Sequence, residues 1–306
     1  MIRAAAIIPT SVIKKDLRLR MRGWRWAGVT TVYVAILGII TTGFLLQKYN
    51  QTASQSSQAG IQLFQSLAIF QLLLIVFVTP ASMAGAISGE RQHRTWDLLL
   101  VSRLSALDIV WGKFLVGIAF NLLLLAASLP LFSLIYLFGG VALGDVIRAF
   151  VVFLVTVLFL GAVSLAVSAL TSRLVVSFMV SMLIALSLAV GLSLLTLYLQ
   201  SPGQPGVVTL AGIPFQSSNT PSPLTPFAQL DPLAALLSTL PSDAGGSLLG
   251  GIGTIDHAFG LPWQLPLWGA YTLLAGAISV GLLLFTTGLV QRPNGTLRWR
   301  NAGGSQ

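Results

Sequence analysis

Six long apolar runs constrain this chain more than any other feature. Each run is long enough to cross the hydrocarbon core of a bilayer, roughly 30 Å, as a helix. Backbone polar groups inside a bilayer must be satisfied within the segment, which favours helices over open strands. The sequence therefore predicts an all-α integral membrane protein with six transmembrane helices. The expected spans are about 27–46, 61–87, 114–138, 146–170, 174–199 and 263–290.

The composition agrees with this class. Hydrophobic residues make up 55% of the chain and charged residues only 8%, whereas a soluble domain carries about 25% charged residues. There is no cysteine, which excludes a disulfide framework and thiol chemistry. The expected organisation is a cytoplasmic leader (1–25), a six-span transmembrane domain (26–291) and a cytoplasmic tail (292–306). An external segment (200–262) precedes the last span.

A charged stretch, Gly89–Lys113, separates the second and third spans and carries seven formal charges. One charge at the bilayer centre costs roughly 3 kcal/mol on insertion scales, and seven cost on the order of 20 kcal/mol. Most of this stretch must therefore lie in water, as a loop between two spans. From Arg91 to Val101 there is no Gly or Pro, and the apolar residues fall on one helical face, which predicts a short amphipathic helix.

A new helix is predicted after this one. Ser105, with Asp108 three residues later, forms a capping box that begins the helix leading into the third span. The alternative for the whole stretch is a plain charged loop that serves only to orient the protein. A capped, helical loop of mixed charge is more than orientation requires.

The charged stretch resembles the pattern GE…GTLELLL…PLS…EIVLGK of the membrane subunits of ABC exporters, the ABC-2 type transporter permeases. Gln92-His93-Arg94 and Arg103 depart from it, standing where Gly and Pro are usual. The matching residues are Gly89-Glu90, Thr95, Leu98-Leu99-Leu100, Ser105, Asp108-Ile109-Val110 and Gly112-Lys113.

The resemblance implies a function and partners. In this family the stretch forms a cytoplasmic coupling helix that contacts a separate ATP-binding subunit. Two permease subunits, identical or paralogous, then pair with two ATP-binding subunits, which bind the ATP and Mg; no cofactor is expected in this chain. The residues expected to couple the two subunits are Gly89, Glu90, Arg91, Arg94, Trp96, Asp97, Leu99 and Leu100.

Two further segments resemble the same family. The basic leader mixes apolar residues with Lys and Arg and suits the cytoplasmic membrane surface; it resembles the helix that opens these permeases, and the alternative is an unstructured tail. A helical pattern from Asp231 to Leu240, with Pro232 at its first position, resembles the short external helices before the last span.

The distribution of basic residues predicts the orientation. With both termini inside the cell, fifteen of the seventeen Lys and Arg residues fall on cytoplasmic segments, and only Lys48 and Arg148 fall outside. The net charge of +9 is therefore an orientation signal and an attraction to anionic lipid, and indicates no nucleic-acid binding. We expect a multi-pass protein of the cell membrane (plasma or inner membrane).

Motifs for chemistry are absent. The chain has no GxxxxGK[ST], no HExxH and no GxSxG, so we expect neither ATP hydrolysis in this chain, nor a metal site, nor any other enzymatic activity. No carboxylate or lysine lies near the middle of a span, which argues against a proton-coupled carrier. Asn121 is the main strongly polar residue inside a span, and an interhelical hydrogen bond is favoured over a substrate contact.

Smaller signals concern packing. Small residues recur at every fourth position of the fifth span, at Ser177, Ser181, Ala185 and Ala189, continuing to Ser193. Such a stripe lets another helix approach closely, either inside one protomer or between protomers of a dimer. Pro80 and Pro130 are expected to bend their spans, and Asp145 is a possible N-cap of the fourth.

We interpret the sequence as the permease of an ATP-driven exporter. Two alternatives stay open: a membrane scaffold or regulatory anchor, and a membrane-embedded lipid-modifying enzyme. The second would need clustered acids or histidines near an interface, and the outer acids are widely spaced. Drug, lipid, peptide and polysaccharide all remain candidate substrates.

Overall fold

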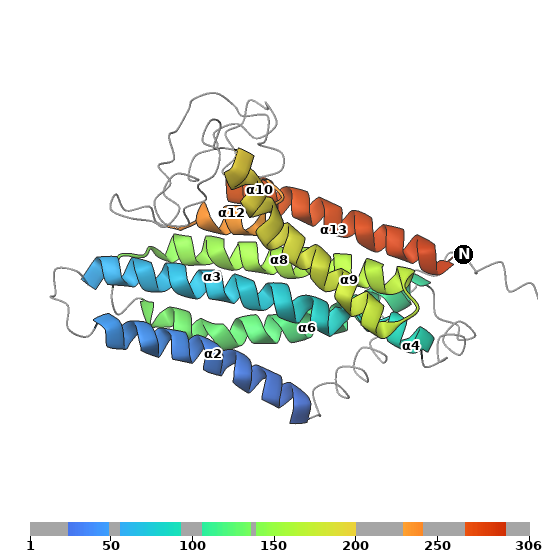
Figure 1. Ribbon diagram of the computed structural model, residues 1–306, viewed down its shortest axis with the longest axis horizontal. Coiled ribbons are helices and arrows are strands. Elements are labelled where there is room, and N and C mark those ends of the chain that lie inside the picture. Colours follow the sequence, from blue (N-terminus) through green and yellow to red (C-terminus); the bar gives the residue numbers. More distant parts are fainter. Residues whose placement is uncertain are drawn as a thin grey trace, which may run out of the picture.

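The computed structural model is a bundle of long helices (Figure 1). It describes residues 24–48, 56–92, 106–135, 139–199, 229–240 and 267–291. Within these residues there is no strand, and six helical segments are long and apolar enough to cross a membrane. The predicted all-α class with six membrane-spanning helices is confirmed. These segments are Ala27–Leu46, Ala59–Gln92, Leu107–Ser133, Leu143–Leu170, Leu174–Leu195 and Leu267–Val290.

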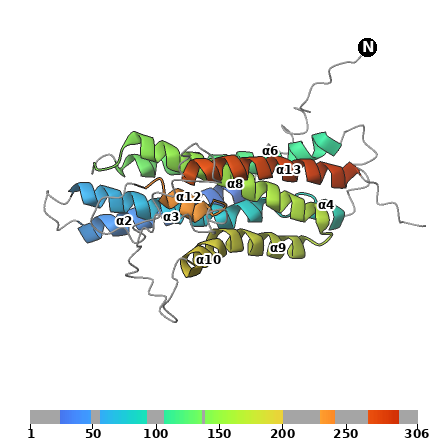
Figure 2. The same ribbon diagram turned by 90° about the horizontal axis from the view of Figure 1, so that it is seen from above.

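The bundle has two distinct ends. The long helices are α2 (Trp24–Lys48), α3 (Ser56–Met83), α6 (Ala106–Ser133), α8 (Leu143–Leu170) and α13 (Leu267–Gln291). The short α4 (Ser88–Gln92) lies at one end, and the short α12 (Pro232–Leu237) lies toward the other (Figure 1). We call them the α4 end and the α12 end. The fifth span, with α9 (Leu174–Leu186) and α10 (Leu192–Leu199), lies on the side opposite α13 (Figure 2).

Helix α8 is the centre of the bundle. It packs against α13, α3, α9 and α6, and it is the most buried of the six spans. Lipid is as apolar as the helix surfaces, so close packing rather than water exclusion holds such helices together. Near its beginning, Phe150 and Phe153 make edge-to-face contacts with Phe132 of α6. Farther along, small buried residues such as Ala162 and Ala169 allow close approach of its neighbours.

The fifth span contains a π-helical turn, η2 (Ser187–Gly191), between α9 and α10. The turn explains how a stripe at every fourth residue can stay on one face. In an α-helix of 3.6 residues per turn, each step of four residues advances about 40° around the axis, so a long stripe drifts off the face. A π-turn holds more residues per turn and reverses part of that drift. The stripe residues Ser177, Ser181, Ala185, Ala189 and Ser193 are all buried.

Helix α12 is docked on the bundle and is too short to span it. Asp231 caps its first turn by accepting a hydrogen bond from the backbone N–H of Leu233, and Pro232 occupies the first helical position. The helix ends at Leu237, three residues before the predicted end at Leu240. It packs against α13, α8, α3 and η2.

The beginning of α8 differs from the prediction. The helix begins at Leu143, with Ala142 at the N-cap position, so Asp145 is not the N-cap. Asp145 instead lies in the first turn, where the helix dipole favours an acid, and it pairs with Arg148 at 3.1 Å.

The two prolines that were expected to bend their spans lie inside helices. Pro80 lies in α3 and Pro130 in α6, and each helix continues for three more residues beyond its proline.

Several predicted elements lie outside the described residues. These are most of the basic leader, the amphipathic helix beyond Gln92, the capping residue Ser105, most of the external segment 200–262 and the tail from 292.

Candidate functional site

The α4 end contains a junction where five helices meet: α3, α4, α6, α8 and α9. Helix α3 ends at Met83, a turn covers Ala84–Ile87, and α4 follows directly at Ser88. We call residues 84–92 the α4 junction. Its last four residues, 89–92, are the first residues of the charged stretch Gly89–Lys113, called the charged loop below. The junction belongs to the same apolar span as α3, yet its turn frees backbone groups that a continuous helix would have paired.

The end of α8 satisfies two of these groups. The Ser168 hydroxyl oxygen accepts hydrogen bonds from the backbone N–H groups of Ile87 at 3.0 Å and Ser88 at 2.9 Å. Ser168 and Ser88 are buried, and a buried N–H without a partner costs roughly 1–3 kcal/mol. A serine eighty residues away in the sequence therefore holds the start of α4 in place.

Helix α6 supplies a cation to the same turn. The Lys113 ammonium lies 2.5 Å from a Glu90 carboxylate oxygen and donates to the backbone carbonyl of Ala86 at 2.7 Å. Both side chains are largely shielded, with 14% of the Lys113 side chain and 28% of the Glu90 side chain exposed. A cation is favourable beside carbonyls at the end of a helix. The two residues stand on opposite sides of the charged loop in the sequence, so their ion pair joins its two ends.

The beginning of α9 makes the third attachment. The Gln92 side-chain oxygen accepts from the backbone N–H of Leu174 at 3.0 Å, which satisfies one of the free donors in the first turn of α9. The Ser177 hydroxyl donates to the carbonyl of Ala84 at 2.6 Å. The α4 junction is thereby hydrogen-bonded to α6, α8 and α9 together.

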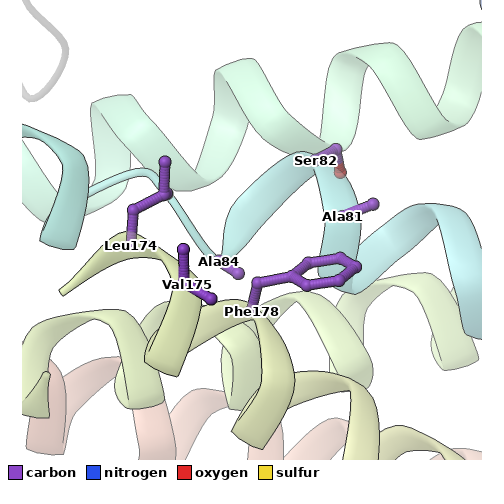
Figure 3. Close-up of a pocket in the computed structure, with 7 residues that line it drawn as sticks. Ala81, Ser82, Ala84, Leu174, Val175 and Phe178 are labelled. Carbon is purple, nitrogen blue, oxygen red and sulfur yellow. The ribbon is translucent and has the colours of Figure 1, made fainter.

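A pocket of about 500 Å³ opens between α3 and α9 beside the junction (Figure 3). Apart from Ser82, the lining residues carry apolar side chains or, at Gly85, none. Phe178 and Val175 of α9 face the α3 side of the pocket, where Ala81 and Ala84 lie. The lining residues are Ala81, Ser82, Ala84, Gly85, Leu174, Val175 and Phe178.

The structure places three of the eight predicted coupling residues. Gly89, Glu90 and Arg91 lie in α4, where Glu90 makes the ion pair described above. The other five, Arg94, Trp96, Asp97, Leu99 and Leu100, lie outside the described residues.

The small-residue stripe packs inside the chain. Ser177, Ser181, Ala185 and Ala189 are each at most 5% exposed. Ser177 faces the α4 junction through its bond to Ala84. The stripe could pack within one protomer or between protomers, and the contact in this structure is within one protomer. The exposed face of α9 carries larger residues, such as Met179 and Leu183.

Asn121 makes interhelical hydrogen bonds, the use favoured from the sequence. Its side-chain oxygen accepts from the Thr79 hydroxyl at 3.1 Å, and its amide donates to the Ser82 oxygen at 3.0 Å. Asn121 is buried, and its contacts to α3 lie next to the pocket wall.

Sequence reasoning missed two groups. Lys113 entered the sequence analysis only as part of the family pattern, and in the structure it turns toward Glu90 and Ala86. The opposite charges at the two ends of the charged stretch were the available signal. No sequence pattern pointed to the role of Ser168, because serine is common in apolar helices and its hydrogen-bond partners lie about eighty residues away in the sequence.

A buried carboxylate lies toward the α12 end. Asp231 is fully buried and accepts hydrogen bonds from the Ser193 hydroxyl at 2.6 Å and from the Leu233 N–H at 2.9 Å. Burial raises the pKa of Asp231 to about 6, although its hydrogen bonds from Ser193 and from the backbone of Leu233 and Ala234 act in the opposite direction. The described residues contain no group of three or more His, Cys, Asp or Glu that could hold a metal ion.

Comparison with protein families identifies a match that covers most of the spans. The sequence profile of the family described as "ABC-2 family transporter protein" matches residues 32–222. This range is more than half of the 306 residues and contains the α4 junction and the pocket. No curated protein sequence matches the chain.

Proposed function

The chain belongs to the ABC-2 transporter family and is a membrane permease of an ABC transporter, and we propose that it forms the substrate pathway of an exporter driven by a separate ATP-binding subunit. The partner binds ATP and Mg and hydrolyses the ATP, and this chain is not an enzyme. Two permease subunits, identical or paralogous, pair with two ATP-binding subunits. The complex lies in the cell membrane, surrounded by lipids, with both permease termini in the cytoplasm.

The attachments of the α4 junction are the observation that carries this proposal. The charged loop begins at Gly89, inside the α4 junction, and residues 84–92 are bonded to α6 through Lys113, to α8 through Ser168 and to α9 through Gln92. A displacement of the loop therefore acts on three spans at once. A loop that only oriented the protein would need none of these bonds.

The coupling step follows from that arrangement. Trp96 and Leu99 in the charged loop fill a groove on the ATP-binding subunit, as buried aromatic and aliphatic anchors do in protein interfaces. When ATP binding brings the two ATP-binding subunits together, they push on residues 89–101, and α4 moves with them. The α4 junction carries the movement to the pocket between α3 and α9, which lies beside the junction and forms part of the substrate pathway.

The test is co-purification of the ATP-binding subunit from detergent extract, together with ATP hydrolysis by the complex. A lost interface anchor costs about 2 kcal/mol or more. Trp96→Ala combined with Leu99→Ala should therefore weaken assembly by well over tenfold, while the permease still inserts in the membrane.

A matched control removes the same side-chain types from α6. Leu107→Ala with Trp111→Ala deletes an exposed leucine and an exposed tryptophan near the beginning of that helix, and it should leave co-purification intact. If the Trp96/Leu99 variant keeps both the partner and its ATP hydrolysis at the level of the unmodified protein, the loop is an orientation signal and the exporter proposal loses its main support.

A further inference from the structure

We propose that residues 80–87, the last turn of α3 and the turn that follows, form a hinged wall of the pocket, with Asn121 holding the hinge and Met83 serving as its pivot. Asn121 and Met83 are then positioning residues for transport. The inference rests on the proposed function, because it explains how a movement of α4 reaches the pocket.

The hinge is at Pro80. Proline has no N–H to donate to the preceding turn of its helix, so the backbone of α3 is weakened there. Asn121 of α6 spans the weak point. It accepts from Thr79 on one side of Pro80 and donates to Ser82 on the other, and its amide also donates to the Gly117 carbonyl of its own helix. One buried side chain thus fixes the angle between the two parts of α3.

The pivot is Met83, which is fully buried at the last position of α3. Its side chain lies in a notch made by two glycines, Gly117 of α6 and Gly161 of α8. A Cβ added at Gly117 would lie 2.4 Å from the Met83 methyl carbon, and one added at Gly161 would lie 2.8 Å from its sulfur. The notch exists only because both positions lack a side chain. Methionine is flexible and can reseat in such a space without breaking a hydrogen bond.

The wall is the face of this segment that meets α9. All four α3-side lining residues of the pocket, Ala81, Ser82, Ala84 and Gly85, lie between Pro80 and Ile87. The two sides are close at the end of the pocket, where a Cβ added at Gly85 would lie 2.7 Å from a terminal carbon of Leu174. The wall is short, with the hinge at Pro80 at one end and α4 at the other. When the wall bends at the hinge and rotates on the Met83 side chain, the width of the pocket changes.

The Ser82 hydroxyl links the hinge to the pocket lining. It accepts from Asn121 and donates to the Thr79 carbonyl at 2.9 Å, and Ser82 is one of the residues that line the pocket. A rotation of the wall therefore also reorients the polar group that a transported molecule would meet.

The experiment measures the width of the pocket in the purified full chain. Ala81 and Val175 lie on opposite sides of the pocket and are exposed. A cysteine pair, Ala81→Cys with Val175→Cys, can be cross-linked without reaction at other thiols, because the chain has no cysteine of its own. Bifunctional thiol reagents of graded length then report the distance between the two sides.

Filling the notch should move the wall. Gly161→Ala or Gly117→Ala places a methyl group against Met83, and the reagent length that cross-links the pair fastest should change, with a several-fold change in rate for the shortest reagent. Gly144→Ala in α8 and Gly112→Ala in α6 are matched controls, because a Cβ at either position meets nothing within 4 Å. Adding Met83→Val to the Gly161→Ala variant removes the sulfur and methyl that the new methyl group would meet. The double variant should therefore regain the cross-linking profile of the unmodified pair.

Releasing the hinge gives an independent reading. Asn121→Leu removes the bonds on both sides of Pro80 and should broaden the range of reagent lengths that react. If Gly161→Ala does not fold, Gly117→Ala and Asn121→Leu decide the matter. An unchanged profile in the folded notch and hinge variants overturns the inference, whatever the partner of the chain is.

A second arm uses the complex with its ATP-binding subunit. ATP with vanadate should shift the cross-linking profile of the unmodified pair and leave the profile of the Gly161→Ala variant fixed. An equal shift in both would rule out Met83 as the pivot. Failure to obtain any complex would count against the proposed function, and the first arm would still judge the hinge.

Discussion

Asp231 is a buried acid, and its burial has a measurable consequence at the scale of one residue. Its pKa is about 6 in the folded protein against an ordinary value of 3.8, so the folded state binds a proton more tightly than the unfolded state. Stability from this group is therefore highest at low pH and falls as pH rises from about 4 to about 6. Tyr271 of α13, whose hydroxyl is hydrogen-bonded to that of Thr156, interacts electrostatically with Asp231.

We expect the protein to gain about 1 kcal/mol from this residue when the pH falls from 7.5 to 5. Asp231→Asn removes the titration but keeps an oxygen for the Leu233 N–H and an amide that can donate to Ser193. The thermal unfolding midpoint of the purified protein at the two pH values, compared between the unmodified chain and the variant, is the measurement. Identical pH dependence in both would mean that Asp231 is not titrating in this range.

The packing of whole helices can be tested at Ala185, which lies where α9 packs on the bundle. It is 1% exposed and stands in the middle of the small-residue stripe. Replacing it with Leu adds bulk to a filled contact, and such overpacking typically costs about 1–3 kcal/mol. We expect a lower thermal unfolding midpoint, and a lower dimer fraction if displacement of α9 also disturbs a protomer contact.

The control for Ala185→Leu is Leu183→Phe on the same helix. Leu183 is 70% exposed, so added bulk there meets no neighbour within the chain. If Ala185→Leu leaves both the dimer fraction and the unfolding midpoint unchanged, the contact between the stripe and the bundle does not stabilise the protein.

The helices were largely predictable from the sequence, because each needs only a local property, an apolar run long enough to cross a bilayer. The arrangement around Gly89 and Glu90 was not. The turn at Ala84–Ile87 depends on Ser168 and Lys113, which are distant in the sequence, and no local pattern marks a serine as the acceptor for two N–H groups. The π-turn at Ser187–Gly191 has no composition of its own.

The candidate site was predictable in its first residues only. The charged loop was recognised from its charges and its family resemblance, and α4 begins it. The burial of Asp231 escaped prediction, because a Pro-rich and Ser-rich segment before the last span reads as exposed loop until the docking of α12 is known.

Orientation in the membrane is a property of the whole molecule. The distribution of Lys and Arg predicts that the charged loop is cytoplasmic and that residues 200–262 are outside. A cysteine in place of Ser217 should react with a membrane-impermeant thiol reagent in intact cells, and a cysteine in place of Ser102 should react only after the cells are opened. The reverse pattern would contradict the proposed orientation of all six spans.

The π-turn in the fifth span also determines where the chain can change length. In a regular α-helix such as α8, deleting one residue turns everything beyond it by about 100°. A π-turn already holds one residue more than the α-helical path requires. A one-residue deletion within Ser187–Gly191 should therefore convert it to α-helix and leave Ser193 facing Asp231. Among related sequences, this is the place in the fifth span where we expect a single-residue gap.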